Sequence, residues 1–295
     1  MDPMESLISV LAEPLCKGLS VLKWQDLVTP LRASDSKSIV VAEGIEPSHL
    51  VSEVRKFGLQ HVCQVGNPFS VQEMLTSALM LSRPIDVMEN PFAAILAPGD
   101  FEQSRERNFV DFQREFDSLN QKPIWLDELK IFMEQKVRAE SLRTEVLTIV
   151  DELYTNVIFN APFVTSDNPM PQVHRGEAKV LPQMPKKAKI KISLRDDSIL
   201  VACEDAFGSL LIDKLMQKIS GCYEKGVEQT MNMGNAGAGI GSYMVFEASA
   251  SYYLFVDPGK KTLIVCRLPV KMSSRARQSV DKNIHFLDLK DKKGD

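Results

Sequence analysis

The segment DELYTNVIFN (151–160) places three polar residues four positions apart: Glu152, Asn156 and Asn160. Four residues of an α-helix turn through about 400°, so these side chains lie nearly above one another on one face. Beside this face, apolar residues recur at the spacing of a buried helix stripe: Leu142, Val146, Ile149, Val150, Leu153 and Val157. The pattern predicts helix over 125–160, with one break allowed, and places the polar stripe at the edge of the core.

The polar stripe has two interpretations. An asparagine carbonyl such as that of Asn156 can bind Mg²⁺ without adding charge beside a triphosphate, because this ion prefers oxygen ligands. A carboxylate one turn earlier, at Glu152, can accept a proton from an attacking hydroxyl or water. The same residue types also occur on ordinary solvated helix faces, so the stripe by itself leaves both interpretations open.

A lone carboxylate stands at the end of a predicted strand in EDAFGSL (204–210). The strand is apolar almost to its end, and Asp205 there can accept a hydrogen bond from an exocyclic amine such as that of adenine. Asp205 can equally cap the helix that is predicted to begin near Ser209. Gly208 allows a close approach of the backbone to a ligand, or simply a turn.

The third informative segment is rich in glycine: GNAGAGIGSYMVFE (234–247). Gly234, Gly237, Gly239 and Gly241 precede or begin an apolar helical pattern. Glycines leave backbone N–H groups free to face phosphate, and a helix N-terminus favours negative charge. The spacing is GxGxG and no apolar strand precedes it, which excludes a Rossmann dinucleotide site. A flexible linker is the alternative interpretation.

Residues from about 125 to 269 resemble the histidine-kinase-like (GHKL) ATPase domain of sensor histidine kinases, anti-sigma-factor serine kinases, gyrase and large heat-shock chaperones. TEVLTIVDELYTNVIFNAP (144–162) is similar to the family's N box, and EDAFGSL to its adenine box. GAGIGSYMV (237–245) is similar to its phosphate box, and KKTLIVCRLP (260–269) to its closing strand. The layout is most similar to that of the anti-sigma-factor kinases. The resemblance implies an α+β two-layer sandwich that binds ATP and Mg²⁺.

The resemblance also implies a role for each matching residue. Glu152 matches the catalytic glutamate, Asn156 the magnesium-binding asparagine and Asp205 the aspartate that contacts adenine. The further nucleotide contacts that it implies are Asn160, Gly208, Gly237, Gly239, Gly241 and Thr262.

The chain departs from the family pattern in its adenine box, where Phe207 and Ser209 replace two glycines. Asn160 stands where the family often has histidine. The leading hypothesis is an ATP-binding bacterial signalling protein, either a protein serine/threonine kinase or a nucleotide-dependent partner switch. The alternative is a non-catalytic scaffold with a degenerate pocket, which would follow if Phe207 fills the space for adenine.

The sequence of the N-terminal half predicts a small α/β domain, because apolar segments typical of strands alternate with helical patterns over short connections. These segments are 38–44, 46–59, 61–66, 70–81, 91–99 and 101–119. The domain is loosely similar to a receiver without its phosphorylated aspartate. The predicted organisation is a helical segment at 1–35, the α/β domain at 36–120, the ATPase domain at 121–272 and a charged, loosely held tail at 273–295.

Composition and charge restrict the class of partner and the location of the protein in the cell. The formal charge of −4 gives no basic field for nucleic acid, and no apolar run approaches the length needed to cross a membrane. The N-terminus lacks the basic start of an export signal, and the five cysteines are scattered without a CxxC pair. These features predict a cytoplasmic protein. The resemblance to the anti-sigma-factor kinases implies a protein partner, either one similar to an anti-anti-sigma factor or another signalling regulator, and formation of a homodimer stays open.

Overall fold

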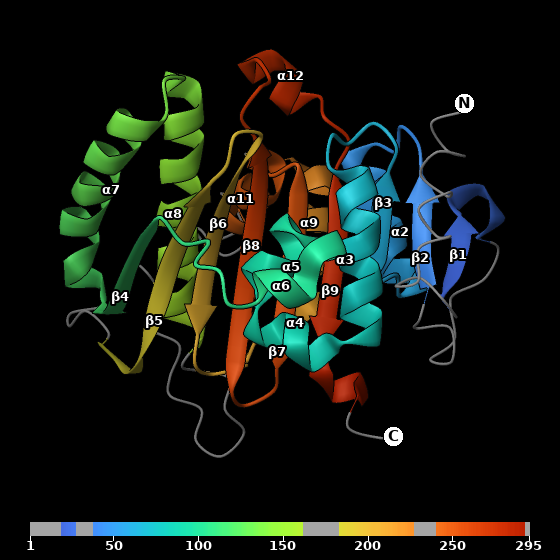
Figure 1. The fold of residues 1–295 in the computed structure, drawn as a ribbon, viewed down its shortest axis with the longest axis horizontal. Coiled ribbons are helices and arrows are strands. Elements are labelled where there is room, and N and C mark those ends of the chain that lie inside the picture. The colour runs from blue at the N-terminus through green and yellow to red at the C-terminus, as the bar shows by residue number, and fades with distance from the viewer. Residues whose placement is uncertain (1–18, 28–37, 162–182, 227–239, 293–295) are drawn as a thin grey trace. The chain divides into compact units, whose positions relative to one another are not determined.

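The computed structural model describes residues 19–27, 38–161, 183–226 and 240–292. The chain divides into two compact units, and its segments alternate between them. Unit 1 contains Met1–Phe109, Ala250–Tyr253 and Ser279–Leu287, and unit 2 contains Val110–Ser249, Leu254–Gln278 and Asp288–Asp295. Figure 1 shows the helices and strands of this mixed α/β fold. Each unit is described by itself below.

The strands of unit 1 follow the order β1-β2-β3-β9, with the first residues of β7 next. β1, β2 and β3 are parallel, and β9 is antiparallel to β3. All five residues of β2 are buried, as expected for a parallel strand that is covered on both faces. The bounds are β1 Ser20–Lys23, β2 Ser38–Ala42, β3 His61–Gln64, β7 Ser251–Asp257 and β9 Asn283–Asp288.

The helices of unit 1 begin and end at recognisable signals. α2 has proline in its first turn and ends at Gly58, whose φ of 68° is left-handed. α3 supplies the longest buried face, and together with β2 and β3 it encloses an apolar cluster of Ile39, Val41, Cys63, Met74, Ala78 and Leu81. The bounds are α2 Pro47–Phe57, α3 Ser70–Ser82, α4 Pro84–Glu89, α5 Pro91–Leu96 and α6 Phe101–Ser104.

Two predicted elements of the N-terminal half are wrong. The segment 91–99, expected as a strand, begins with helix α5, because a short buried apolar run that contains proline and alanine suits either element. The segment 101–119, expected as a helix, forms the short α6 and then strand β4, Phe112–Ser118. The receiver-like hypothesis therefore loses the third strand on which it relied.

The expectations for the two ends also need correction. Residues 20–23, expected to be helical, form β1, and most of the predicted segment 1–35 lies outside the described residues. The predicted loose tail at 273–295 contains helix α12, Ser274–Gln278, and the buried strand β9. Five of the six residues of β9 are buried, although charged residues flank it on both sides.

Unit 2 has a sheet with the strand order β7-β8-β6-β5-β4, of which the last residues of β7 belong to this unit. The pairs β8–β6, β6–β5 and β5–β4 are antiparallel. The strand predicted to end at Asp205 and the closing strand predicted within 260–269 are both present, as β6 and β8. The bounds are β5 Gln183–Leu194, β6 Ser198–Asp205 and β8 Lys261–Pro269.

Four helices of unit 2 pack on this sheet and on one another, which gives two layers. α8 contacts β5 and β6, α7 contacts β4, and α11 contacts β8 as well as α8 and α9. The ring of Tyr154 on α8 stacks on Phe116 of β4 at 3.9 Å, and its hydroxyl donates to the Ser118 carbonyl at 2.6 Å. The bounds are α7 Lys122–Lys136, α8 Glu140–Asn160, α9 Ile212–Lys225 and α11 Ile240–Ala248.

Within the described ranges, the helices are too short or too polar to span a lipid bilayer.

Candidate functional site

The three residues of the predicted polar stripe lie on α8, in its last three turns. Glu152 and Asn156 are half-buried and Asn160 is exposed. The side-chain amide of Asn160 donates to the Asn156 carbonyl at 2.9 Å. The stripe therefore lies at the edge of the core, with the Asn160 amide turned back on its own helix.

The Glu152 carboxylate packs directly against the start of α11. A Cβ atom built on Gly241 would lie 1.8 Å from Glu152 Oε2, so only glycine fits there while the carboxylate keeps its position. The sequence predicted Gly241 as a phosphate contact, but in this structure its lack of a side chain accommodates Glu152. Gly237 and Gly239, the other predicted members of the phosphate loop, lie outside the described residues.

Asp205 and Thr262 are directly opposite each other at adjacent ends of β6 and β8. Both are almost completely buried, with 5% and 3% of their surface exposed. Asp205 Oδ1 accepts a hydrogen bond from the Phe207 backbone N–H at 2.8 Å. The Thr262 hydroxyl is buried and, among the described residues, has no partner within hydrogen-bond distance. The pair thus places a buried carboxyl group and a buried hydroxyl side by side.

Burial is the main influence on the charge of Asp205. It raises the pKa of the Asp205 carboxyl from 3.8 to about 6, and the neighbouring Glu204 adds to the rise. The backbone N–H groups of Phe207 and Gly208 and the nearby Thr262 hydroxyl favour the charged form, but they do not compensate for the lost hydration. A carboxyl group in this condition gains from any ligand that offers it a hydrogen-bond donor.

Gly208 is required by the protein's own packing. Its φ of +59° is left-handed, and a Cβ atom there would lie 2.0 Å from the Asp257 carbonyl oxygen. The Gly259 N–H donates to the Gly208 carbonyl at 3.3 Å, which joins this loop to the turn between β7 and β8. The close approach predicted for Gly208 is therefore to the turn at 257–260.

The loop that follows Asp205 is joined to the end of α8. The Ser209 hydroxyl donates to the carbonyl of Ala161, the residue after the last one of α8, at 2.8 Å. The adjacent Phe207 is buried, and Lys186 of β5 lies over its ring with the ammonium 5.8 Å from the ring centre. Asp205 is thus held near the end of the helix that carries the polar stripe.

The pKa of Asp205 predicts a specific pH dependence of stability. Between about pH 4 and 6 the folded chain holds one more proton at Asp205 than the unfolded chain, so this group's contribution to stability falls as the pH rises. Asp205→Asn removes the buried charge. We expect it to raise the free energy of unfolding by up to about 3 kcal/mol near pH 7.5, with the gain fading toward pH 4. Urea unfolding of the wild type and of Asp205→Asn between pH 4 and 7.5 measures this gain. A difference in the free energy of unfolding that does not change with pH would contradict the prediction.

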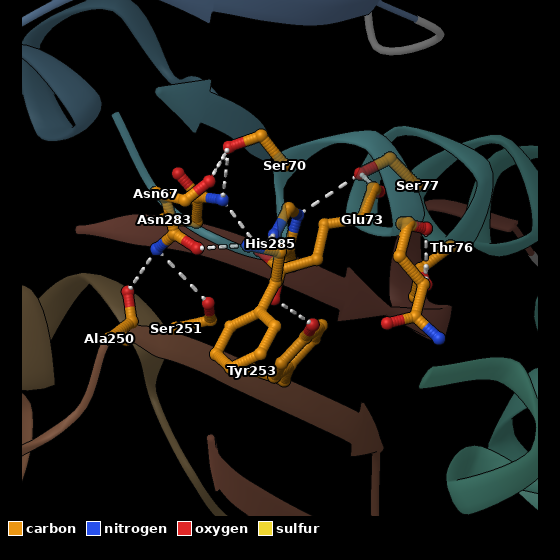
Figure 2. Close-up of polar contacts among 12 residues, drawn as sticks. Asn67, Ser70, Glu73, Thr76, Ser77, Ala250, Ser251, Tyr253, Asn283 and His285 are labelled. Carbon is orange, nitrogen blue, oxygen red and sulfur yellow. Dashed lines mark hydrogen bonds and ion pairs between the residues drawn. The ribbon is translucent and has the colours of Figure 1, made fainter. Parts of the chain in front are cut away.

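A second polar cluster, in unit 1, was not predicted from the sequence (Figure 2). Its centre is Glu73 on α3, which is fully buried. Glu73 Oε1 accepts from the Tyr253 hydroxyl at 2.7 Å, and Oε2 accepts from the Asn283 amide at 2.6 Å. His285 Nε2 lies 3.2 Å from Oε2, and its Nδ1 lies 3.0 Å from the Ser77 hydroxyl.

The order Ser77–His285–Glu73 has the connectivity of a nucleophile, base and acid. All three residues have no exposed surface, so a substrate cannot reach the hydroxyl. The cluster joins α3 to β7 and β9, which come from distant parts of the sequence. We therefore interpret it as a structural network of unit 1. The signal available in the sequence was weak: a glutamate within the apolar run of α3, and Asn283 and His285 alternating with apolar residues in β9.

The buried Cys203 and Cys266 behave as small core residues. Burial raises the pKa of both thiols, that of Cys266 to about 12. Within the described part of the chain, no three His, Cys, Asp or Glu side chains gather into a metal-binding group.

Comparison with known proteins adds little to this description. No protein-family model matches the sequence, and no curated protein matches it. Among solved structures, a chain of the SiaB–SiaC complex from Pseudomonas aeruginosa is similar at 13% identity, over 57% of this chain and 95% of that one, with a TM-score of 0.38. We draw nothing about function from a likeness of that size.

Proposed function

We propose that unit 2 binds ATP together with Mg²⁺. The observation that carries this proposal is the pair at the strand ends, where the buried Asp205 carboxyl lies beside the buried Thr262 hydroxyl. A carboxyl group that is desolvated enough to shift its pKa by about two units is typical of functional sites, since it weakens the fold unless a ligand uses it.

In this proposal, each of the named residues would contact a different part of the Mg²⁺–ATP complex. The Asp205 carboxylate would accept a hydrogen bond from the exocyclic amine of adenine, with the Thr262 hydroxyl beside it. Asn156, half-buried on α8, would offer its carbonyl oxygen to Mg²⁺, whose remaining ligands are phosphate oxygens and water. Glu152, one turn earlier on the same face, would accept the proton of an attacking hydroxyl or water.

The position of Phe207 bears on the alternative, a non-catalytic scaffold in which this ring fills the space for adenine. Its ring is turned toward Lys186, which belongs to β5, on one side of β6. Thr262 belongs to β8, on the other side of β6. The described ring contact of Phe207 is therefore with a side chain of β5, and titration of ATP decides whether the ring also occupies the space for adenine.

We further propose that the ATPase unit serves signalling in the cytoplasm. The acceptor of the γ-phosphate would be a serine or threonine of a protein partner, or ATP would switch the affinity for that partner. This part of the proposal rests on the resemblance to the anti-sigma-factor kinases. Self-association into a homodimer is one arrangement in which such a partner could be bound.

Titration of ATP into Asp205→Asn tests the pocket. Loss of a charge-assisted hydrogen bond should weaken ATP binding by roughly 10-fold or more, which corresponds to about 1.5–3 kcal/mol. The same substitution should stabilise the free protein near neutral pH, so weaker binding cannot be attributed to unfolding. Equal affinity of the two proteins for ATP would show that Asp205 is outside the nucleotide site.

A further inference from the structure

We propose that Arg277 is a positioning residue for Glu152, an inference that rests on the proposed ATPase function. Arg277 belongs to α12, which follows β8, and only 5% of its surface is exposed. Its guanidinium group is bound to the N-terminal half of α8. None of the sequence patterns described above pointed to this residue.

Four hydrogen bonds fix the Arg277 guanidinium. Nε and Nη2 donate to the two oxygens of Glu145 at 2.8 and 2.9 Å, in a bidentate pair. Nη2 also donates to the Ser141 hydroxyl at 2.8 Å, and Nη1 donates to the Met272 carbonyl at 2.7 Å. A planar fork bound in this way fixes orientation as well as distance, which a lysine ammonium does not do.

Arg277 binds α8 on the same face of the helix that carries Glu152. Glu145 and Glu152 are seven residues apart, and seven residues turn through about 700°, within about 20° of two full turns. Both carboxylates therefore project from nearly the same side of the helix. Since Arg277 holds Glu145, it adds a fixed point to the core packing that orients α8 about its axis, and with it the direction of Glu152.

The close packing around the Glu152 carboxylate makes its position sensitive to the rotation of α8. The carboxylate fills the space beside Gly241 so closely that even a methyl group would overlap it. α12, which carries Arg277, also contacts α11, which carries Gly241. The two helices on either side of the carboxylate contact each other directly, and α12 adds a second connection between them through Arg277 and its contact with α11. A displacement of about 1 Å in a catalytic group can lower a rate by about 10²-fold.

The test compares Arg277→Met with Arg143→Met. Arg143 also stabilises the start of α8, since its Nη1 donates to the carbonyls of Val137 and Arg138 at 2.9 and 3.0 Å. It lies nine residues before Glu152, about half a turn away, on the opposite face. Arg277→Lys is the conservative variant, which keeps the charge and loses the fork. If Arg277→Met does not fold, Arg277→Lys takes its place in the comparison.

We expect Arg277→Met to lower kcat for ATP turnover by about 10-fold or more and to change KM by less than about 3-fold, with Arg277→Lys in between. Arg143→Met should change kcat by less than about 2-fold. Equal kcat losses in the two methionine variants, or an unchanged kcat in Arg277→Met, would overturn the proposal.

Amide exchange without nucleotide separates this inference from the proposed function. Peptides that cover α11 should exchange several-fold faster in Arg277→Met than in wild type, and at the wild-type rate in Arg143→Met. If this pattern appears but wild type neither binds nor turns over ATP, the proposed function fails and the mechanical role of Arg277 stands. If α11 exchanges alike in all three proteins, the positioning role is wrong.

Discussion

Glu152→Gln is expected to lower ATP turnover by about 10²–10⁴-fold and to leave ATP affinity within about 3-fold, because a general base acts on the rate and contributes little to binding. Glutamine has nearly the same size, so the packing against Gly241 is preserved. The measurement is the release of phosphate, or its transfer to a co-purified protein, beside a calorimetric titration of ATP.

Asp151→Asn is the matched control for Glu152→Gln. Asp151 is the preceding residue of α8 and pairs with Lys122 at 2.6 Å, with its side chain 40% exposed. We expect its turnover to be close to that of wild type. A Glu152→Gln protein as active as this control would rule out the assigned base. A wild-type protein that binds ATP without any turnover would instead favour the non-catalytic scaffold.

Glu73→Ala is expected to lower the free energy of unfolding by about 3–5 kcal/mol. The substitution leaves the Tyr253 hydroxyl, the Asn283 amide and His285 Nε2 without the acceptor that they share, at a place with no exposed surface. Buried polar groups that lose their partner keep the cost of desolvation and lose the compensating bond. Urea unfolding followed by circular dichroism measures the loss.

Glu73→Gln controls for the size of the side chain. It keeps one acceptor oxygen but turns an amide group toward a donor, so it should destabilise unit 1 clearly less than alanine. ATP binding to unit 2 provides an independent readout of whether the remainder of the chain is folded. A loss below about 1 kcal/mol in Glu73→Ala would mean that water or neighbouring groups replace the carboxylate, and that the network contributes little.

Sequence patterns predicted the elements whose periodicity is unambiguous. The apolar stripe of α8 spans several turns, and β5 alternates between charged and apolar residues. Prediction failed where the apolar residues of a short segment fit both the repeat of a helix and the repeat of a strand. Phe112 and Phe116 are four apart, as in a helix stripe, yet both are buried from one face of β4. Arg114 lies between them and pairs with Glu128 of α7 at 2.7 Å, which no local pattern indicates.

Short motifs predicted which residues of the candidate site lie together, while their roles stay predictions. Asp205 and Thr262 were named from their boxes, and the structure places them opposite each other. Gly208 and Gly241 were assigned to a ligand, whereas the described contacts are with the turn at 257–260 and with Glu152. Contacts between distant segments were missed altogether. Arg277 and Glu145 are 132 residues apart, and only the folded chain reveals their pairing.

The most direct test of the account is a calorimetric titration of ATP into the wild-type chain, once with Mg²⁺ and once with a chelator. We predict saturable binding of one ATP per chain that weakens without Mg²⁺, and an Asn156→Ala protein whose affinity no longer responds to the metal. Absence of binding at millimolar ATP in the folded protein, with Mg²⁺ present, would contradict the claim that unit 2 is a nucleotide-binding unit.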